Sequence, residues 1–305
     1  MDFQLTEDQR ALRGGVREIL EGRFDVGALR AAADSSGVPS LDRALWRELG
    51  DAGFFSLRVP EEEGGVGLGL PEAVLAFEEA GRALLPGPLV ATFLAARDVE
   101  GADRGAVVVT AVSGGLGGGI EGGLGGGLVP WLDEADVVLG DVSGAVPLRS
   151  VDPLTPLHRV PGGGAGARTG TEAEADLLIA AEQVGSAGKT CEMAVQYARE
   201  RTQFGQAIGA FQAVKHLCAQ MLVRTEVARA AVYAAAVTGD VLEIAGAKLL
   251  ADEAAVRGAR DCLQVHGGMG FTWEADVHLH LKRAWVRAGL GRTAARAEEE
   301  LAAAL

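Results

Sequence analysis

The feature that most constrains the fold of this 305-residue chain is a series of long helical patterns that begins at about residue 172. Apolar residues recur there at the three- and four-residue spacing that places them on one face of a helix. The first three faces are marked by Leu177, Leu178, Ala181, Val184, Gly185 and Gly188, then by Phe211, Val214, Leu217, Cys218, Met221, Leu222 and Ala228, then by Ile244, Leu249, Val256, Ala259 and Leu263. A fourth pattern runs from Asp276 to the C-terminus, and Gly239 and Gly267 are expected to end two of the helices. Four long helices with short links predict an antiparallel four-helix bundle over residues 173–305.

The residues before this bundle divide into two further predicted domains. Residues 1–100 are expected to form an N-terminal helical domain, with helices that begin after Thr6, after Ser40, near Pro71 and at Leu89. Residues 101–172 are expected to form a small glycine-rich β domain, whose strand candidates are Ala106–Val112, Leu128–Leu132, Ala135–Leu139 and Leu157–Val160. The predicted fold class is therefore mainly α with a small β domain.

Composition and charge exclude several classes of function. The formal net charge of −14 argues against nucleic-acid binding through a basic surface, although a few placed arginines can still hold an anionic ligand. No apolar stretch approaches 20 residues and the N-terminus is acidic, so we expect no membrane span, no signal peptide and a cytoplasmic location. Three widely spaced cysteines, Cys191, Cys218 and Cys262, show no metal-ligand spacing and are predicted to be reduced core residues.

A run rich in glycine, residues 113–127, invites comparison with a phosphate-binding loop. It lacks the Lys-Ser or Lys-Thr ending of such a loop, and no helix pattern follows it. We therefore interpret it as a low-complexity connection rather than a nucleotide site.

The densest polar and aromatic stretch between apolar helices is Tyr197–His216. Arg201 can bind a phosphate, Gln203 can bond an adenine or a ribose, and Phe204 can stack on a flat ring. The alternative is a structural corner between helices, in which the arginine satisfies C-terminal carbonyls and the phenylalanine is buried.

A second stretch of this kind is Gln264–Glu274. Paired glycines after a helix allow the backbone to approach a ligand closely, but they are also ordinary chemistry for ending a helix. His266 is a candidate base, with a structural hydrogen-bonding role as the alternative. His278 and His280 are two residues apart, which would point them to different faces of a helix and away from a shared metal.

Together the two stretches resemble the acyl-CoA dehydrogenase family. The residues that carry the resemblance are Arg-Thr-Gln-Phe-Gly with Ile-Gly-Ala-Phe-Gln-Ala-Val-Lys-His, and then Gln-Val-His-Gly-Gly-Met-Gly-Phe-Thr-Trp-Glu. It extends over nearly the whole chain, since Leu-Thr-Glu-Asp-Gln near the N-terminus and Val59-Pro-Glu-Glu-Glu-Gly-Gly-Val-Gly-Leu also match.

The resemblance implies an oxidoreductase of lipid metabolism with FAD as cofactor. Members oxidise an acyl-CoA thioester: a carboxylate removes the α-proton while the β-hydrogen moves as hydride to the flavin, and electrons pass to an electron-transfer flavoprotein. They are usually tetramers that share each FAD between subunits. The resemblance assigns contacts with the FAD pyrophosphate and adenosine of a neighbouring subunit to Arg201, Gln203, Phe204, Gln212, Gln264, Val265, Gly267 and Gly268.

The sequence departs from the family at the catalytic base. The usual glutamate position corresponds to Gly291, and the alternative position used by some members corresponds to Ala175. Glu174 is a weak substitute candidate, with a simple helix-start charge as the alternative. If the pocket is otherwise intact, Gly291→Glu is expected to return some activity.

A second departure is the middle domain, which is shorter than usual. The Thr/Ser- and Trp-containing strand segments that hold the isoalloxazine ring in the family are not recognisable. Shortened subunits of this kind pair with a complete partner in a heterotetramer. We therefore expect a hetero-oligomer with a second acyl-CoA dehydrogenase chain that supplies the base.

Two alternatives remain open at this point. One is a self-sufficient homo-oligomeric dehydrogenase that uses Glu174 or another carboxylate as base. The other is a non-enzymatic helical scaffold that has lost flavin chemistry, because a fold can outlive its chemistry.

Overall fold

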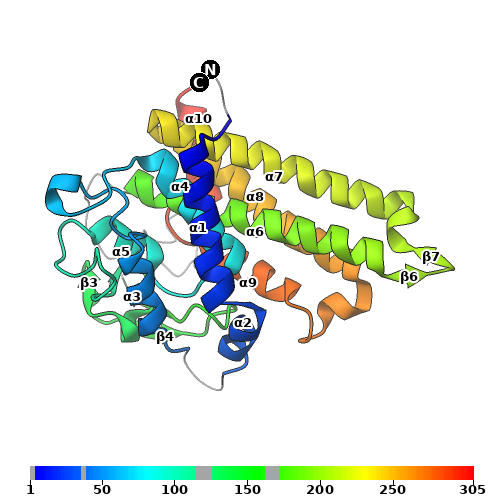
Figure 1. Ribbon diagram of the computed structural model, residues 1–305, viewed down its shortest axis with the longest axis horizontal. Helices are drawn as coiled ribbons and strands as arrows, with labels where there is room; N and C mark the ends of the chain where they lie inside the picture. Colours follow the sequence, from blue (N-terminus) through cyan, green and yellow to red (C-terminus); the bar gives the residue numbers. More distant parts are fainter. Residues whose placement is uncertain (1–3, 36–38, 114–125, 162–171) are drawn as a thin grey trace.

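A computed structural model describes residues 4–35, 39–113, 126–161 and 172–305 of the chain (Figure 1). The described part is mostly helical with small sheets, which confirms the predicted fold class. The glycine run interpreted above as a connection lies almost entirely outside the described residues. None of the described helices combines the length and the apolar character needed to cross a membrane.

The N-terminal part is a group of helices around an aromatic core. Its elements are α1 (Glu7–Arg23), α2 (Val26–Ala33), α3 (Arg43–Asp51), η1 (Glu61–Glu63), α4 (Leu70–Ala83) and α5 (Leu89–Ala95). Thr6 caps α1 with a capping box, as its early acidic residues suggest. The short α2 was not predicted, since its eight residues are too few for a clear periodicity.

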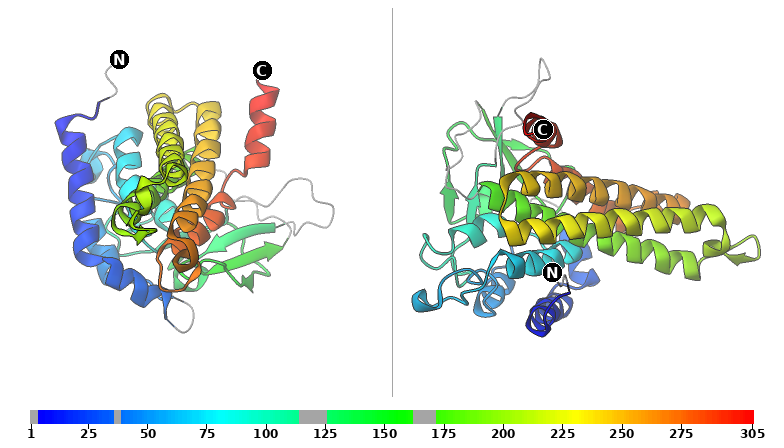
Figure 2. Two further views of the ribbon diagram at one scale, coloured as in Figure 1. Left: turned by 90° about the vertical axis from the view of Figure 1, so that its right-hand side faces the viewer. Right: turned by 90° about the horizontal axis from the view of Figure 1, so that it is seen from above.

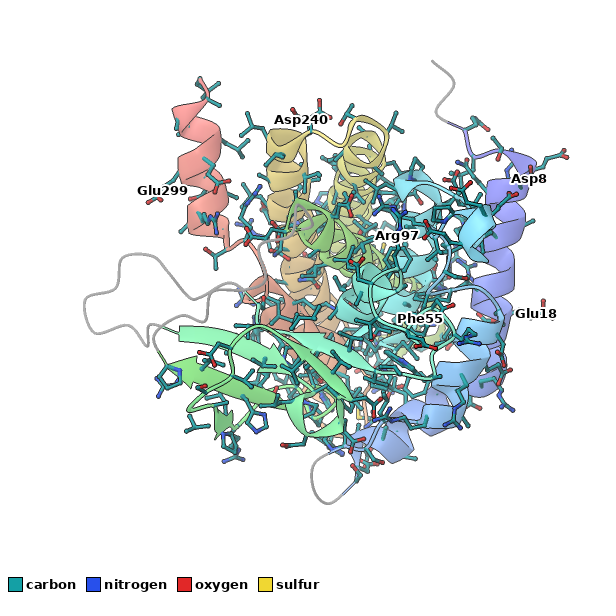
Figure 3. The ribbon with its side chains drawn as sticks, turned by 90° about the vertical axis from the view of Figure 1, so that its left-hand side faces the viewer. Asp8, Glu18, Phe55, Arg97, Asp240 and Glu299 are labelled. Atoms are coloured by element: carbon teal, nitrogen blue, oxygen red, sulfur yellow. The ribbon has the colours of Figure 1, made fainter. Side chains whose placement is uncertain are left out.

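Phe55 lies at the centre of this core, in contact with Trp46 and Phe54 at ring-centroid distances of 4.9 and 5.3 Å. Phe77 and Phe93 extend the aromatic cluster toward α5. Phe55 is buried, whereas the charged side chains of Asp8 and Glu18 lie at the edge of the molecule in Figure 3.

The middle segment contains two small sheets. Its elements are β1 (Val109–Ala111), β2 (Gly126–Pro130), η2 (Leu132–Glu134), β3 (Val137–Leu139), β4 (Val146–Leu148) and β5 (Leu157–Pro161). β1 pairs in parallel with β3, and β5 lies between β2 and β4 in an antiparallel sheet of three strands. These strands cover one end of the bundle (Figure 2).

Long helices form the rest of the molecule and extend away from the β strands (Figures 1 and 2). Its elements are α6 (Glu172–Glu200), β6 (Thr202–Gln203), β7 (Gln206–Ala207), η3 (Ile208–Ala210), α7 (Gln212–Thr238), α8 (Val241–His266), η4 (Gly267–Phe271), α9 (Val277–Ala288) and α10 (Ala294–Ala303). Gly239 and Gly267 end α7 and α8, both with positive φ, as predicted.

Close backbone contact joins α4 to α6. A Cβ atom at Gly81 would lie 2.0 Å from the carbonyl oxygen of Glu182, and one at Gly185 would lie 1.9 Å from that of Glu78. Small residues at these positions therefore allow the N-terminal helices to pack directly against the bundle.

The predicted fourth helix is wrong as a single element. It is two helices, α9 and α10, separated by residues 289–293. Gly291 has a φ of 68°, in the left-handed region, so the backbone turns there instead of continuing the helix.

Candidate functional site

In the stretch after α6, β6 and β7 form a β-hairpin with a two-residue turn at the far end of the bundle (Figure 1). Phe204 and Gly205 occupy its turn with φ values of 53° and 81°, the type I′ pattern that favours Asn-Gly. A phenylalanine in the left-handed region is strained, and this one is 92% exposed. The buried phenylalanine of the structural alternative is therefore absent, and Phe204 presents its ring to the outside.

The polar residues of this hairpin region have spare hydrogen-bonding capacity. Arg201 is exposed, and its guanidinium bonds to none of the described residues, so it does not satisfy the carbonyls at the end of α6. Gln203 donates to the adjacent Thr202 carbonyl at 2.9 Å, and Gln212 is exposed at the first turn of α7. Free donors of this kind suit an anionic or polar ligand.

The loop after α8 also presents an open backbone. Gly267 has φ 59° and ψ −137°, a conformation that only glycine adopts readily, and a Cβ at Gly268 would meet nothing within 4 Å. Gln264 is exposed, whereas Val265 is buried in the bundle core. Val265 can therefore face a ligand through its backbone only.

A ring contact joins the two stretches. Tyr197, in the last turn of α6, stacks on His266 with the ring centroids 4.1 Å apart. Nδ1 of His266 lies 2.8 Å from the Cys262 carbonyl oxygen, which can only accept, so Nδ1 carries the proton. His266 thus has the structural role that was the alternative to a base. We call residues 201–212 and 264–271 together the distal tip.

The three cysteines of the chain converge in the bundle core near the tip. Cys191 and Cys262 are buried, Cys218 packs against them, and burial raises the pKa of all three thiols. Among the described residues no group of three or more metal-ligating side chains is arranged to hold a metal ion.

At the opposite end of the bundle lies a cavity of about 730 Å³. It is lined by α5, by residues in and next to β1 to β3, by the first half of α6, by α9 and by the segment that leads into α10. Its apolar wall comes mainly from α5, where Leu89, Val90 and Leu94 face the space. The predicted base positions, Ala175 and Gly291, both line this cavity.

The arginines in the wall of the cavity are all paired with carboxylates. Arg287 bonds to Glu182 at 2.7 Å, and Arg283 bonds to the buried Asp152. Arg292 and Arg296 share Glu300, at 3.2 and 2.8 Å. Every arginine that lines the cavity therefore has a carboxylate partner, and the described lining holds no free cation for a phosphate.

Burial shifts the pKa of the groups in this wall. Desolvation raises the pKa of the Glu182 carboxyl and lowers the pKa of Arg287 to about 10. Desolvation also raises the pKa of Asp176, against the opposing effect of the Arg292 backbone N–H, Lys248 and Arg292. Buried charges of this kind persist only because their partners lie beside them.

Gly291 cannot hold the family's glutamate in this conformation. A Cβ atom there would lie 2.2 Å from Oδ1 of Asp176, and the positive φ would strain any larger residue. Oδ1 of Asp176 accepts the backbone N–H of Arg292 at 2.7 Å, and the backbone N–H of Gly291 donates to Ser113 Oγ at 2.6 Å. These bonds hold the segment with a carboxylate in the space where the glutamate side chain would begin, so the expectation that Gly291→Glu returns activity has no structural support.

Glu174, the weak candidate base, faces away from the cavity. Its two carboxylate oxygens accept the guanidinium of Arg58, at 2.6 and 3.1 Å, and so join α6 to the N-terminal part. Asp176 follows it by two residues, which turns the side chain about 200° around the helix and toward the cavity. The helix turn thus makes Asp176, and not Glu174, the carboxylate of the cavity.

Sequence reasoning missed Asp176 and Arg283. Arg283 bonds to Asp152, to the Leu85 carbonyl and to the Leu154 carbonyl, and so joins three segments of the chain at the cavity wall. The signal for Asp176 was a charged residue between the apolar Ala175 and Leu177 on a helix that periodicity predicts to be buried. Nothing in the sequence indicated the partners of Arg283, which are 129–198 residues away.

Comparisons with known proteins point to one family. A family model described as acyl-CoA dehydrogenase, N-terminal domain, matches residues 6–100, and one described as acyl-CoA dehydrogenase, C-terminal domain, matches residues 165–297. The acyl-CoA dehydrogenase IpdE2 of Mycobacterium tuberculosis (strain ATCC 25618 / H37Rv) is 35% identical over 292 residues, which cover 91% of each chain.

Solved structures with the same fold include chains from two-component assemblies. The ChsE4-ChsE5 complex of Mycobacterium tuberculosis matches with a TM-score of 0.83 and 25% identity, covering 99% of this chain and 98% of that one. The Tcur3481-Tcur3483 steroid ACAD (G363A variant) matches with the same TM-score and identity, covering 97% of each chain.

Proposed function

The chain belongs to the acyl-CoA dehydrogenase family, and from that premise we propose that it is a subunit that completes an FAD site in a second dehydrogenase chain. The reaction of the assembly would be the α,β-dehydrogenation of an acyl-CoA thioester. The partner chain would supply the catalytic base, and an electron-transfer flavoprotein would accept the electrons.

One observation carries this proposal: the cavity is lined by residues near the start of α6, whereas the distal tip follows the end of that helix (Figure 1). Asp176 is near the start of α6 and Arg201 follows its end, so at 1.5 Å per residue they are separated by about 37 Å along the helix. Residues assigned to the adenosine side of FAD therefore face outward, away from this chain's own cavity. This placement supports a role of the tip in binding a cofactor that another chain holds.

The tip residues fit the adenosine side of FAD. When bound, FAD supplies the ring that accepts the hydride in this class of reaction. Arg201 would hold a phosphate through its unpaired guanidinium, and Phe204 would contact a flat ring. Gly267 and Gly268 would let the backbone approach the cofactor closely, since neither position carries a side chain. Gln203, Gln212 and Gln264 would add hydrogen bonds to the same ligand.

The residues that line the cavity support the proposal that the partner chain supplies the base. Gly291 has no room for a glutamate, Ala175 has no acid, and Asp176 is engaged by the backbone of Arg292. The cavity also holds no free cation to receive the phosphates of CoA or FAD among its described lining. The two-component assemblies found among the similar structures are consistent with division of the two tasks between chains.

Asp176 itself favours a second candidate function, a self-sufficient dehydrogenase. It is a buried carboxylate between the two positions at which the family carries its base, and it lines the cavity. In this alternative Asp176 would take the α-proton in the chain's own cavity.

Purification of the chain alone and together with its partner chain separates these functions. We expect a colourless chain alone, and a yellow complex that oxidises acyl-CoA with an artificial electron acceptor. A yellow and active chain without a partner would contradict the proposal, and a colourless, inactive complex would favour a non-enzymatic scaffold.

Asp176→Asn in the complex tests the second candidate. Asparagine keeps an oxygen for the Arg292 N–H but cannot accept a proton as a base. Unchanged turnover in the variant is expected if the partner supplies the base. Loss of turnover with FAD and both subunits retained would assign the base to this chain.

A further inference from the structure

The loop that follows α8 and carries Gly267 and Gly268 is fixed at both ends by aromatic residues. At its start His266 stacks on Tyr197. At its end Trp273 stacks on His278, with ring centroids 4.6 Å apart, and the Lys282 ammonium lies 4.5 Å from the centre of the indole ring. Between these ends the chain makes a short 3₁₀ helix, in which Phe271 is 78% exposed.

Trp273 is held by a helix from the other end of the sequence. The indole N–H donates to Asp34, and the Trp273 carbonyl accepts the guanidinium of Arg30. Arg30 also pairs with Asp276, three residues farther along. Both holding residues belong to α2 or directly follow it, in the N-terminal part of the chain.

These contacts reach across a gap in the packing. A cavity of about 360 Å³ lies between α1, α2, α4, α6 and α9, with Val26 and Leu29 on one side and Met193 and His280 on the other. This space separates part of α2 from the bundle, and the polar contacts of Arg30 and Asp34 connect α2 to the loop. The position of α2 and the conformation of the loop are therefore coupled through Trp273.

We propose that Arg30 and Asp34 are positioning residues for the loop that follows α8, Gly267–Thr272, which they hold by clamping Trp273. The identity of the ligand of that loop, the adenosine side of a dinucleotide cofactor, rests on the function proposed above. The clamp itself rests only on the contacts of Arg30, Asp34 and Trp273. Neither Arg30 nor Asp34 touches the ligand in this proposal; they set the backbone that does.

The chemistry of the clamp predicts which substitutions it tolerates. Arginine presents several N–H groups in one plane and can bond a carbonyl and a carboxylate together, whereas lysine offers a single ammonium. Arg30→Lys should therefore behave nearly like Arg30→Ala. Asp34→Asn keeps an oxygen for the indole N–H and should remain close to wild type, whereas Asp34→Ala should not.

The experiment uses the full chain in complex with its partner dehydrogenase. Backbone hydrogen exchange over residues 267–272 measures the order of the loop, and flavin fluorescence measures the dissociation constant of FAD. We expect Arg30→Ala to speed exchange in this segment by about tenfold or more and to weaken FAD binding by about tenfold. Asp34→Ala combined with Trp273→Phe should be no worse than the poorer single variant, because both remove the same bond.

Arg43→Ala is the matched control. Arg43 also joins an N-terminal helix to a carboxylate and a carbonyl, those of Asp136 and Glu134, but it does so at the β strands. It should leave exchange at 267–272 and FAD binding at wild-type values. An equal loss of FAD in Arg43→Ala would overturn the proposal, because the effect would then be general destabilisation.

The result also separates this inference from the proposed function. Unchanged exchange at 267–272 in Arg30→Ala would overturn the clamp, whatever the complex binds. Faster exchange with unchanged FAD binding would overturn the positioning role. A wild-type complex without FAD would contradict the proposed function, while faster exchange in the variant would still support the clamp.

Discussion

The distal tip and the cavity lie at opposite ends of α6 and differ in how their polar groups are paired. At the tip, the Arg201 guanidinium is exposed and has no partner among the described residues, and the space beside Gly267 and Gly268 is open. At the cavity, charged groups such as Asp152, Glu182 and Arg287 are buried and paired. The polar groups of the tip are free to bond another molecule, whereas those of the cavity bond other residues of the chain.

The physical reason for this difference is hydration. An exposed guanidinium is solvated by water, so it needs no protein partner until a ligand arrives. A buried charge without a partner costs several kcal/mol, so a cavity with charged walls must contain the counter-charges as well. Substitutions should therefore destabilise the fold at the cavity and weaken ligand binding at the tip.

The largest effect is expected at Arg283. Arg283→Ala removes the bonds to Asp152, Leu85 and Leu154 and leaves the Asp152 carboxylate buried beside fewer donors. We expect the free energy of unfolding to fall by about 3–5 kcal/mol, measured by urea denaturation. Arg97→Ala, at an exposed arginine that pairs with Glu63, is the control and should have no measurable effect. An equal change in the free energy of unfolding for the two variants would contradict the expectation that substitutions at the cavity destabilise the fold.

Gly291→Glu should destabilise the chain without creating activity. The added Cβ would overlap Asp176 and the left-handed backbone would be strained, so we expect a loss of about 2–3 kcal/mol. Gly289→Ala is the matched control, because its φ is −89° and its nearest contact would be 3.4 Å away. Restored turnover in the Gly291→Glu chain would show that this segment moves to admit a glutamate.

Arg201→Ala should have the opposite effect: it should weaken ligand binding and leave the stability of the fold unchanged. Removal of one charge-assisted contact to phosphate should weaken FAD retention by the complex about 10- to 100-fold. The unfolding transition should stay at the wild-type value, because the guanidinium has no partner among the described residues. Unchanged FAD retention would remove the proposed role of Arg201.

Acid should destabilise the buried part of the bundle through His280. This side chain is 2% exposed and bonds to Ser186 at 2.8 Å, and burial among Lys189, Arg287, Arg283 and Arg82 lowers its pKa to about 3. The unfolded state, with an ordinary histidine pKa near 6.5, binds the proton more readily. The stability from neutral His280 is therefore complete above pH 6.5 and is lost as the pH falls from 6.5 toward 3, by up to about 1.4 kcal/mol per pH unit.

Unfolding of wild type and His280→Asn between pH 4 and pH 7 measures this contribution. The variant is expected to be less sensitive to pH in that window than the wild type. Equal slopes would show that other groups dominate, such as Asp176 and Glu182, whose raised pKa values act in the opposite direction.

The smallest effect is expected at Phe204. Asparagine is better suited than phenylalanine to the first position of a type I′ turn, so Phe204→Asn should stabilise the chain by about 0.5–1 kcal/mol. The same substitution should weaken FAD retention, because the exposed ring is lost. A variant that is both more stable and fully competent to bind FAD would show that the strain at Phe204 serves no ligand.

Particular elements show how far the sequence predicts the fold. Helical periodicity predicted α6, α7 and α8, because a long helix buries one face along its whole length and so repeats its signal many times. It did not find α2, which has only eight residues, and it did not find the break between α9 and α10. That break depends on Asp176 and Ser113, which bond to residues 291 and 292 from distant parts of the chain.

The sequence by itself determined the fold class, the family and the chemical character of the two stretches at the tip, since these depend on local patterns and motif spacing. Only the tertiary structure decided that Glu174 faces Arg58 while Asp176 faces the cavity, and that Phe204 is exposed rather than buried. It also decided that Arg30 and Asp34 of the N-terminal part hold Trp273. The direction of a side chain and its long-range partners follow from how the helices pack, and a local sequence pattern carries no information about packing partners more than a hundred residues away.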